Sequence, residues 1–457
     1  MSAIAVIDIG KTNAKLALVD PETLEETAVL TRPNTVRPGP PWPHFDVQGH
    51  WEFILDGLTR LARSHPISAI SVTTHGACAA LLDAQGQLAA PILDYEHTGP
   101  ETCRAAYDAI RPPFAKTGSP RLGAGLNLGA QLFWQFQQIP ELAAQVMHVV
   151  TYPQYWGYLL TGEVACDVTS LGCHTDLWDI TTGQPSVLVD RLGLAGKLAP
   201  LRGPDEVLGH LRGNLALRTG LSPETPVACG IHDSNASLLP HLLGRVAPFG
   251  VLSTGTWVVA MAIGGGVASL DDSRDLLVNV NARGESVPSA RFMGGREHEL
   301  ALGGRAGAIT QSALLEVLEK GVMLLPTMVH GSGPFGSHRP EWREGEPPIG
   351  SDARAVAVGF YLALVSAECL ALIGQVGPVI VEGPFSRNPA FLNMLAAASG
   401  AKIICAKGQT GTSQGAAMLF VQDAGCATDA RAPLSQAERG NYQRYASQWM
   451  RVVKARP

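Results

Sequence analysis

A carboxylate stands beside a glycine turn near the start of the chain, between two apolar runs. Asp8 follows the run Ile4–Ile7, the turn Gly10-Lys11-Thr12-Asn13 comes next, and Lys15–Val19 alternates as a second strand would. Glycine lets the backbone approach an anion, and the N–H groups of such a turn can face phosphate oxygens. A carboxylate is the hard oxygen ligand that magnesium prefers, here through water. These residues predict a site for a phosphate tail and its Mg²⁺ ion.

The same turn contains an apparent P-loop that its surroundings exclude. Gly10-Lys11-Thr12 matches the end of a Walker A loop, but that motif requires a glycine where this chain has Ala5. It also requires a helix after the loop, whereas a strand is expected here. We therefore reject the P-loop interpretation.

A second strand–turn–strand segment occurs at Gly250–Gly264. Its turn is Ser253-Thr254-Gly255-Thr256, and apolar runs lie on either side. Elsewhere, helical periodicity at Trp51–Ser64 is followed by an apolar strand at Ile67–Thr73, which is typical of an α/β fold. Two hairpins of this type predict two similar domains, with a boundary near residue 245 and a nucleotide in the cleft between them.

Asp233 is the candidate for acid–base chemistry. The apolar strand Val227–Cys229 leads to Gly230-Ile231-His232-Asp233, and a helix is expected to begin there. A carboxylate in this place can accept the proton of a hydroxyl group that attacks a phosphoryl group. The alternative is that Asp233 only caps the helix, a role that suits aspartate. His232 is read as a supporting residue.

Composition narrows the class of protein. The chain has 457 residues, of which 46% are hydrophobic and 16% charged, as in a globular enzyme of two domains. The net charge of -6 argues against nucleic acid and anionic membranes as partners. No C-x-x-C pair, signal peptide or membrane span is recognised, because the longest apolar run, Val356–Ile373, is interrupted by Ser366 and Glu368. We expect a cytoplasmic protein.

Together these segments resemble the FGGY family of carbohydrate kinases, in the superfamily of actin, hexokinase and heat-shock-protein ATPases. The most specific match is Thr151–Asp179, where an aromatic-rich helix ends in Leu160-Thr161-Gly162-Glu163 and is followed by Asp167 and Thr169-Ser170. The resemblance implies an α/β fold of two actin-like (ribonuclease H-like) domains, 1–245 and 246–457, with the nucleotide cleft between them. Lys11 and Gln154 depart from the family, which usually has a hydroxyl residue and an aspartate there.

The resemblance also assigns roles to single residues. Asp8 would orient Mg²⁺, and Asp233, within a segment similar to G-x-H-D-x-x-A, would be the general base. The residues implied in ATP binding come from both hairpins and from a G-x-x-x-x-N-P segment: Gly10, Lys11, Thr12, Asn13, Thr254, Gly255, Thr256, Gly383 and Asn388. Trp257 is not required by this chemistry, and packing in the core is the alternative for it. Small residues at Gly415-Ala416-Ala417 are expected to allow tight helix packing.

The sugar site is implied by two further segments. His75 and Gly76 follow a strand, Glu96 lies in Asp94-Tyr95-Glu96, and His232 and Asp233 would complete the site. Planar polar groups of this kind suit a substrate rich in hydroxyl groups. The alternatives are that His75 is structural and that Glu96 is an exposed loop charge.

The expected function is therefore an ATP-dependent sugar kinase. It would transfer the γ-phosphate of MgATP to a hydroxyl of a ketose or related polyol, with ATP and Mg²⁺ as cofactors and a homodimer as a possible assembly. One alternative is a catalytically silent, nucleotide-binding regulatory protein on the same fold. A dinucleotide-dependent oxidoreductase fits poorly, because the G-x-G-x-x-G at Gly331–Gly336 lies in an irregular stretch.

Overall fold

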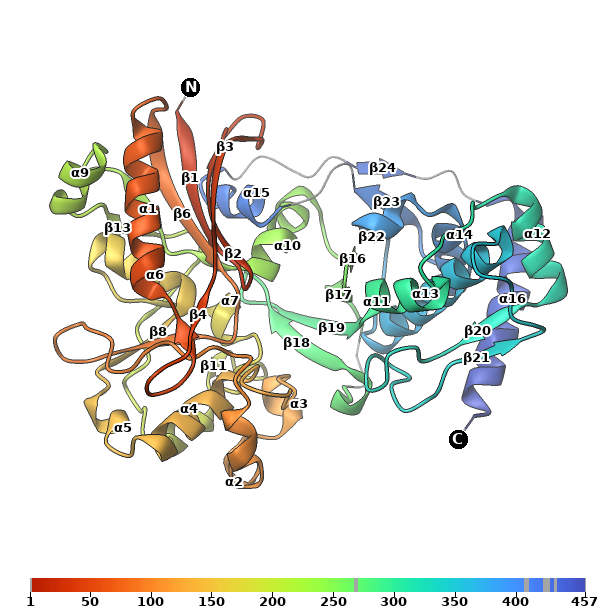
Figure 1. The fold of residues 1–457 in the computed structure, drawn as a ribbon, viewed down its shortest axis with the longest axis horizontal. Helices are drawn as coiled ribbons and strands as arrows, with labels where there is room; N and C mark the ends of the chain where they lie inside the picture. The colour runs from red at the N-terminus through yellow and green to blue at the C-terminus, as the bar shows by residue number, and fades with distance from the viewer. Residues whose placement is uncertain (1, 267–269, 407–410, 422–427, 431–433, 457) are drawn as a thin grey trace. The chain divides into compact units, whose positions relative to one another are not determined.

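The computed structural model of the chain describes residues 2–266, 270–406, 411–421, 428–430 and 434–456, with the backbone alone at 428–430. It divides into two compact units (Figure 1). Unit 1 comprises residues 1–245, 278–286 and 410–425. Unit 2 comprises residues 246–277, 287–409 and 426–457. The sequence had placed all of 246–457 in one domain, so two short segments of that range belong instead to unit 1.

Unit 1 is built on a mixed sheet in the order β13-β14-β6-β1-β2-β3, with β15 paired to β6. The central β1 runs antiparallel to β2 and parallel to β6, so Asp8 lies opposite both Lys15 and Thr73. The strands are β1 Ala3–Ile9, β2 Asn13–Val19, β3 Glu26–Pro33, β6 Ile67–Thr74, β13 Val207–His210, β14 Pro226–Ala228 and β15 Ile231–His232.

Side chains of β1 alternate between two apolar layers, as a sheet covered on both faces requires. Ala5, Ile7 and Ile9 pack in the cluster that contains helix α1 (Val47–Ala62). Ile4 and Val6 pack in a second cluster with helices α10 (Asp233–Gly244) and α15 (Thr412–Ala417). Asp8 follows Val6 in this alternation and therefore lies on the α15 side of the sheet.

Gly415 shows why small residues are needed in α15. A β-carbon at Gly415 would clash with the carbonyl oxygen of Ala236 in α10. Ala416 and Ala417 are fully buried in the same layer. The expected tight packing of this helix is confirmed, and its partners are β1 and α10 of unit 1.

The rest of unit 1 consists of shorter elements, some of which are drawn below the sheet in Figure 1. They include β7 Ala79–Leu82, α2 Arg104–Ile110, α3 Phe114–Thr117, α4 Leu128–Gln138, α5 Leu142–Gln145, β8 His148–Thr151, α6 Tyr152–Thr161, β9 Cys166–Asp167, α7 Val168–Leu171, α8 Val187–Arg191 and α9 Gly213–Thr219. Helix α6 ends at Gly162, which has a φ of 94° and closes the helix in the left-handed conformation.

Unit 2 repeats the theme with a sheet in the order β18-β19-β17-β16-β22-β23-β24. The strands of this sheet are β16 Phe249–Thr254, β17 Val258–Ile263, β18 Leu276–Val280, β19 Ser286–Phe292, β22 Val379–Glu382, β23 Ile403–Ala406 and β24 Thr428–Ala430. Residues 278–280 of β18 and residue 286 of β19 belong to the 278–286 segment of unit 1. As in unit 1, the first strand of the hairpin, β16, is antiparallel to the second, β17, and parallel to a further strand, β22. Its helices are α11 Gly294–Leu302, α12 Gln311–Lys320, α13 Asp352–Leu372, α14 Pro389–Ser399 and α16 Gln436–Lys454.

Helix α13 is the one described helix that is long and apolar enough to cross a membrane by length and composition. Within unit 2, however, 78% of its most apolar window is buried. It packs against α14 and α12 and contributes much of the apolar core. The helix therefore behaves as a core element of unit 2, as the sequence predicted.

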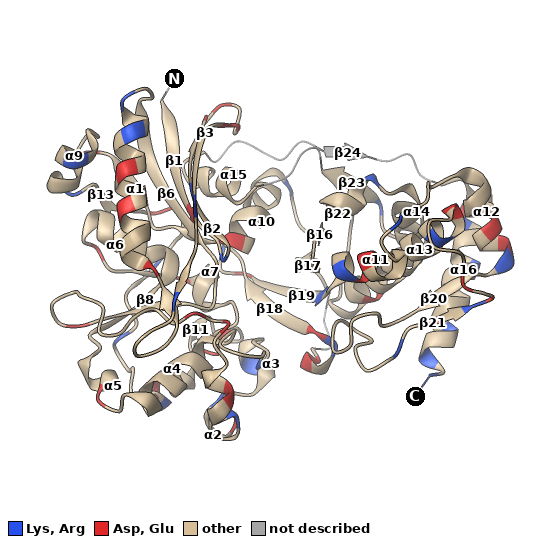
Figure 2. Cartoon of the chain, in the orientation of Figure 1, with Lys and Arg blue, Asp and Glu red and all other residues tan. Residues whose placement is uncertain are grey.

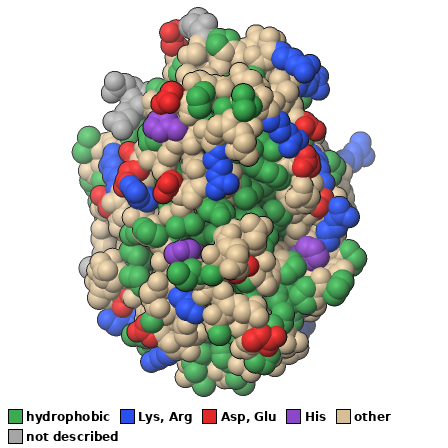
Figure 3. Space-filling model, turned by 90° about the vertical axis from the view of Figure 1, so that its left-hand side faces the viewer, with side chains coloured by type: hydrophobic (Ala, Val, Ile, Leu, Met, Phe, Trp, Pro, Cys, Tyr) green, Lys and Arg blue, Asp and Glu red, His purple; other side chains and the backbone are tan. Residues whose placement is uncertain are grey.

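Charged side chains of both signs are spread over both units (Figure 2). On the face of the molecule drawn in Figure 3, Lys and Arg side chains alternate with Asp and Glu, and apolar side chains fill much of the centre. That face carries no single-sign field of the kind that steers a polyanion.

Candidate active site

The turn of the first hairpin is held in place by a neighbouring loop. Gly10 N–H donates to the Asn13 carbonyl oxygen at 2.9 Å. The Asn34 side chain donates to the Gly10 carbonyl oxygen at 2.8 Å, and its backbone N–H donates to Thr12 at 2.9 Å. The side chains of Thr12 and Asn13 are exposed. The turn is thus fixed through its carbonyl groups, which leaves the Thr12 and Asn13 side chains available to a ligand.

Asn34 is in turn oriented by a buried chain of polar groups. His50 Nε2 lies 2.8 Å from Asn34 Oδ1, and Arg32 donates to His50 Nδ1 at 2.9 Å. Arg32 is also paired with Asp46. Because Asn34 donates through its nitrogen to Gly10, its oxygen must accept, so His50 carries its proton on Nε2. Burial lowers the pKa of His50 to about 4, which keeps the ring neutral. The sequence did not single out these residues.

Asp8 is buried at the end of β1, with 8% of its surface exposed. Thr412 of α15 donates to its carboxylate, and Lys15 Nζ lies 3.6 Å from Oδ2. Burial raises the pKa of Asp8, and the nearby negative charge of Asp233 acts in the same direction. A single carboxylate with hydroxyl neighbours fits a magnesium ion that keeps several of its waters. Among the described residues no group of three or more His, Cys, Asp or Glu side chains could hold a metal ion.

Lys11 points away from the turn in which it lies. Its ammonium group is paired with Asp94, and it lies 3.1 Å from Glu96 Oε2. It also lies 4.9 Å from the centre of the Tyr95 ring and 5.2 Å from that of Phe45. The sequence placed Lys11 with the phosphate-binding residues, whereas its side chain contacts the segment expected to bind sugar.

His75 lies among the same aromatic side chains. Its ring centre is 4.9 Å from Phe45, 5.2 Å from Tyr95 and 5.1 Å from Tyr152. Nδ1 lies 2.9 Å from the Gly76 carbonyl oxygen and therefore donates to it. Burial lowers the pKa of His75 to about 4, so Nε2 is an acceptor at neutral pH. This buried Nε2 has no partner within the described part of the chain.

Gly76 allows His232 to approach the His75 segment. A β-carbon at Gly76 would lie 2.5 Å from His232 Nε2. His232 Nδ1 lies 2.8 Å from the Ser234 hydroxyl, and Nε2 lies 3.3 Å from Asp233 Oδ1. Burial lowers the pKa of His232 to about 4 as well. The neutral imidazole therefore sits in contact with the Asp233 carboxylate.

Asp233 is the first residue of α10, and its side chain is 32% exposed. The N-cap position belongs to His232, which makes no side-chain capping bond, while Asp233 Oδ1 accepts from Ser234 N–H at 2.6 Å. The carboxylate is therefore not a conventional N-cap. Desolvation raises the pKa of Asp233, with His75 and the Ser234 N–H opposing that shift. A raised pKa suits a group that must accept a proton near neutral pH.

The strand before Asp233 is positioned by Gln154, where the family usually has aspartate. Gln154 is fully buried and donates to the carbonyl oxygens of Cys229 at 3.1 Å and Gly230 at 3.0 Å. From the other side, the His232 N–H donates to Thr169 Oγ1 at 3.0 Å. An amide can donate to two carbonyl groups, which a carboxylate cannot. Gln154 is thus a structural support for the segment that carries Asp233.

The second hairpin has a different set of contacts. The Thr254 hydroxyl donates to the Glu382 carbonyl oxygen at 2.5 Å and accepts from Phe385 N–H at 3.1 Å. Gly383 has a φ of 80°, and a β-carbon there would clash with the Thr254 carbonyl oxygen. Thr254 and Gly383, both expected to bind ATP, therefore hold β16 against the 383–385 turn. Trp257 is 39% exposed beside Arg291, so the alternative that it packs in the core is wrong.

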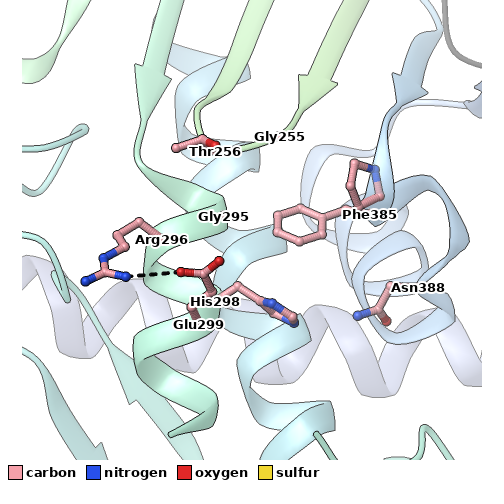
Figure 4. Close-up of a pocket in the computed structure, with 9 residues that line it drawn as sticks. Gly255, Thr256, Gly295, Arg296, His298, Glu299, Phe385 and Asn388 are labelled. Atoms are coloured by element: carbon pink, nitrogen blue, oxygen red, sulfur yellow. Dashed lines mark hydrogen bonds and ion pairs between the residues drawn. The ribbon is translucent and has the colours of Figure 1, made fainter. Parts of the chain in front are cut away.

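A pocket of about 410 Å³ opens beside this hairpin within unit 2. Gly255, Thr256 and Asn388, three of the residues predicted from the sequence to bind ATP, line it together. The rings of Phe385 and His298 point into it, 5.4 Å apart (Figure 4). Asn388 Oδ1 caps α14 by accepting from Phe391 N–H at 3.1 Å. Apolar rings with a few polar groups are suited to a planar heterocycle.

One wall of this pocket was missed by the sequence analysis. Helix α11 supplies Gly295, Arg296, His298 and Glu299, and Arg296 pairs with Glu299 at 3.1 Å (Figure 4). A β-carbon at Gly295 would clash with the Gly255 carbonyl oxygen, so α11 can approach the hairpin only because this residue is glycine. The pair Gly294-Gly295 at the start of the helix was the available signal.

Comparison with protein families covers almost the whole chain. Residues 3–240 match the family model described as "FGGY family of carbohydrate kinases, N-terminal domain". Residues 246–430 match "Carbohydrate kinase FGGY, C-terminal domain".

Known proteins and structures give a consistent result. The chain is 31% identical over 202 residues to an L-fuculokinase of Haemophilus influenzae, covering 43% of this chain and 42% of that protein. It is 26% identical over 273 residues to an L-fuculokinase of Salmonella typhi, covering 58% and 57%. The chain thus spans about half the length of these curated relatives.

A carbohydrate kinase from Novosphingobium aromaticivorans has a similar structure, with a TM-score of 0.91, 37% identity, and coverage of 100% of this chain and 99% of that one. A xylulose kinase from Lactobacillus acidophilus shares the fold, with a TM-score of 0.79 and 16% identity over 100% and 98% of the two chains.

Proposed function

Because the chain belongs to the FGGY family of carbohydrate kinases, we propose that it transfers the γ-phosphate of MgATP to a hydroxyl group of a ketose or related polyol. The observation that carries the proposal is the arrangement around Asp233. A carboxylate of raised pKa lies beside His232, and in the same set of interacting groups of unit 1 the Nε2 of His75 has no partner among the residues that the structure describes. This site offers a base and a hydroxyl-binding acceptor atom together.

In this proposal the oxygen of the acceptor hydroxyl attacks the γ-phosphorus and ADP departs. Asp233 accepts the proton that this hydroxyl group loses. His75 Nε2 accepts a hydrogen bond from another hydroxyl of the acceptor and so orients it. The pocket of unit 2 binds the adenosine moiety against Phe385 and His298. Asp8 would hold Mg²⁺ through water, and the ion, when bound, neutralises charge on the phosphate oxygens.

Two further observations support the class of substrate and the location. The curated relatives include proteins named L-fuculokinase and xylulose kinase, which supports a ketose acceptor. A cytoplasmic location agrees with the burial of α13 in the core of unit 2. The alternative of a silent regulatory protein gains no support from these relatives, all of which are named as kinases.

The test is ADP release from MgATP across a panel of ketoses and polyols, with Asp233→Asn measured in parallel. Release that depends on one class of acceptor and on Asp233 is the expected result. ADP release that ignores every acceptor, or that persists at the wild-type rate in Asp233→Asn, would contradict the proposal. Asp190→Asn, which changes an exposed aspartate in α8, is the matched control and should behave as wild type.

A further inference from the structure

Lys11 belongs by sequence to the phosphate turn and by contact to a different group of residues. Its backbone lies between Gly10 and Thr12, but its ammonium group is paired with Asp94 and lies 3.1 Å from Glu96 Oε2. Asp94 is 83 positions away in the chain. The pairing is therefore a product of the fold.

The contacts of Lys11 are those of the proposed acceptor site. The ammonium group lies 4.9 Å from the centre of the Tyr95 ring and 5.2 Å from that of Phe45. The His75 ring contacts these same two rings, at 5.2 Å and 4.9 Å. His75 also carries the buried Nε2 that has no partner among the described residues. Lys11 and this free acceptor atom are thus part of one aromatic-walled cluster.

We propose that Lys11 is a specificity-determining residue of the acceptor site, where it holds the Asp94 and Glu96 carboxylates in place to bind hydroxyl groups of an uncharged acceptor. This inference rests on the proposed function and refines it. Charge-assisted hydrogen bonds from fixed carboxylates are directional and strong, so they suit an acceptor that presents adjacent hydroxyl groups.

The charge balance of the cluster disfavours an anionic acceptor. One ammonium group faces two carboxylates, and the negative charge of Asp233 acts on the His75 and Tyr95 side chains of the same cluster. Lys11 is therefore fully engaged and has no spare charge for a carboxylate or phosphate on the acceptor. Like charges brought together at a binding site reduce affinity, which gives selection against charged sugars.

The Michaelis constants of Lys11→Met separate this role from phosphate binding. Methionine keeps the length of the side chain and removes its charge. We expect the KM for the acceptor to rise by about 10-fold or more, which corresponds to the loss of one charge-assisted contact, while the KM for MgATP stays within about twofold. Lys11→Arg should rescue most of the acceptor KM. Lys320→Met, an exposed lysine in α12, is the control.

A rise in the KM for MgATP with an unchanged acceptor KM would overturn the proposal and return Lys11 to the phosphate site. Acceptor binding is also measured by calorimetry without nucleotide, so that it does not depend on turnover. If wild type binds the acceptor but makes no ADP, the proposed function fails and the Lys11 proposal is judged by the binding of Lys11→Met alone. If wild type binds no acceptor in the panel, both proposals are overturned.

Glu96→Gln tests the charge balance separately. The Glu96 side chain is 66% exposed, so this change leaves the fold intact. It frees part of the Lys11 charge, which can then attract an anion. The ratio of the association constants of an uncharged sugar and the matching sugar acid should therefore fall by about 10-fold. An unchanged ratio would contradict selection by charge.

Discussion

The two units contain hairpins of the same backbone pattern, but the side chains at the two turns differ. In each, the first strand is antiparallel to the second and parallel to a further strand, and a glycine turn joins the pair. The first turn has an acid before it and a lysine within it, and buried polar groups fix its carbonyl groups. The second turn has no charged residue. Its Thr254 hydroxyl is already hydrogen-bonded to the backbone of Glu382 and Phe385.

Under the proposed function, this difference corresponds to a division of roles between two units that share a backbone pattern. Asp8, Lys11, His75 and Asp233 all lie in unit 1, so the groups to which we assign metal orientation, acceptor binding and proton acceptance belong to that unit. The second hairpin and α11 shape a pocket with aromatic walls in unit 2. A shared backbone pattern therefore does not imply shared chemistry, because the charged side chains decide it.

The largest effect should come from unit 1, in Asp233→Asn. The amide keeps the shape of the side chain but cannot accept the proton, and general-base catalysis contributes roughly 10²–10⁴-fold. We expect kcat to fall by about that factor while the KM for MgATP changes little. Steady-state kinetics with the acceptor found in the panel measures both values. A kcat within threefold of wild type would show that another group is the base.

Asp8→Asn should weaken the response to magnesium. Loss of a carboxylate that orients a bound metal through its waters reduces metal affinity or activity by about 10–100-fold. The Mg²⁺ concentration at half-maximal rate should therefore rise by that factor. Thr256→Ala in the second hairpin is the comparison and should leave the Mg²⁺ midpoint unchanged. Equal shifts in the two variants would contradict the division of roles.

Substitution of Gly383, which packs against the second hairpin, should lower stability more than substitution of Gly10 in the first hairpin. Gly383 has a φ of 80°, and a β-carbon there would clash with the Thr254 carbonyl oxygen. At Gly10 the nearest atom to a β-carbon would be the Asn13 carbonyl oxygen at 3.2 Å, with no positive φ. Gly383→Ala should lower the free energy of unfolding by about 1–3 kcal/mol or more, and Gly10→Ala by less than about 1 kcal/mol. Denaturant unfolding monitored by tryptophan fluorescence measures both, and similar losses would contradict the contrast.

The smallest expected effect is on the pH dependence of stability. The pKa of buried His50 is about 4 when folded and 6.5 in the unfolded chain. Between these values the unfolded chain binds more protons, so the free energy of unfolding falls as pH is lowered from about 6.5 to about 4. Removing the group in His50→Gln should make that slope shallower by at most about 1.4 kcal/mol per pH unit. Urea unfolding between pH 7 and pH 5 gives the difference.

Carboxylates of raised pKa, such as Asp8 and Asp233, act with the opposite sign, but they are present in both proteins and cancel in the comparison. Identical slopes for wild type and His50→Gln would show that the histidine is not kept neutral by burial.

The sequence predicted those features that short-range patterns determine. Alternating apolar residues around Asp8 and the glycine turn predicted the first hairpin, and the run before Asp233 predicted a helix that begins there. Asn388 before Pro389 predicted both the start of α14 and its cap. In each case the neighbours in sequence supply the physical cause.

Features that depend on distant partners were not predictable in this way. The direction of the Lys11 side chain depends on its pairing with Asp94. Helix α15 belongs to unit 1 because Gly415 packs on Ala236. The Arg32–His50–Asn34 chain that holds the first turn joins β3 and the loop after it to α1. Local sequence does not predict such pairings, because they form only when the sheet is assembled.

Hydrogen–deuterium exchange with single ligands tests the division of roles most directly. ADP alone should protect residues 255–256, 295–299 and 384–388 of unit 2. The acceptor alone should protect residues 75–77, 94–96 and 231–234 of unit 1. Protection of the unit 2 segments by the acceptor, or their failure to respond to ADP, would contradict the account.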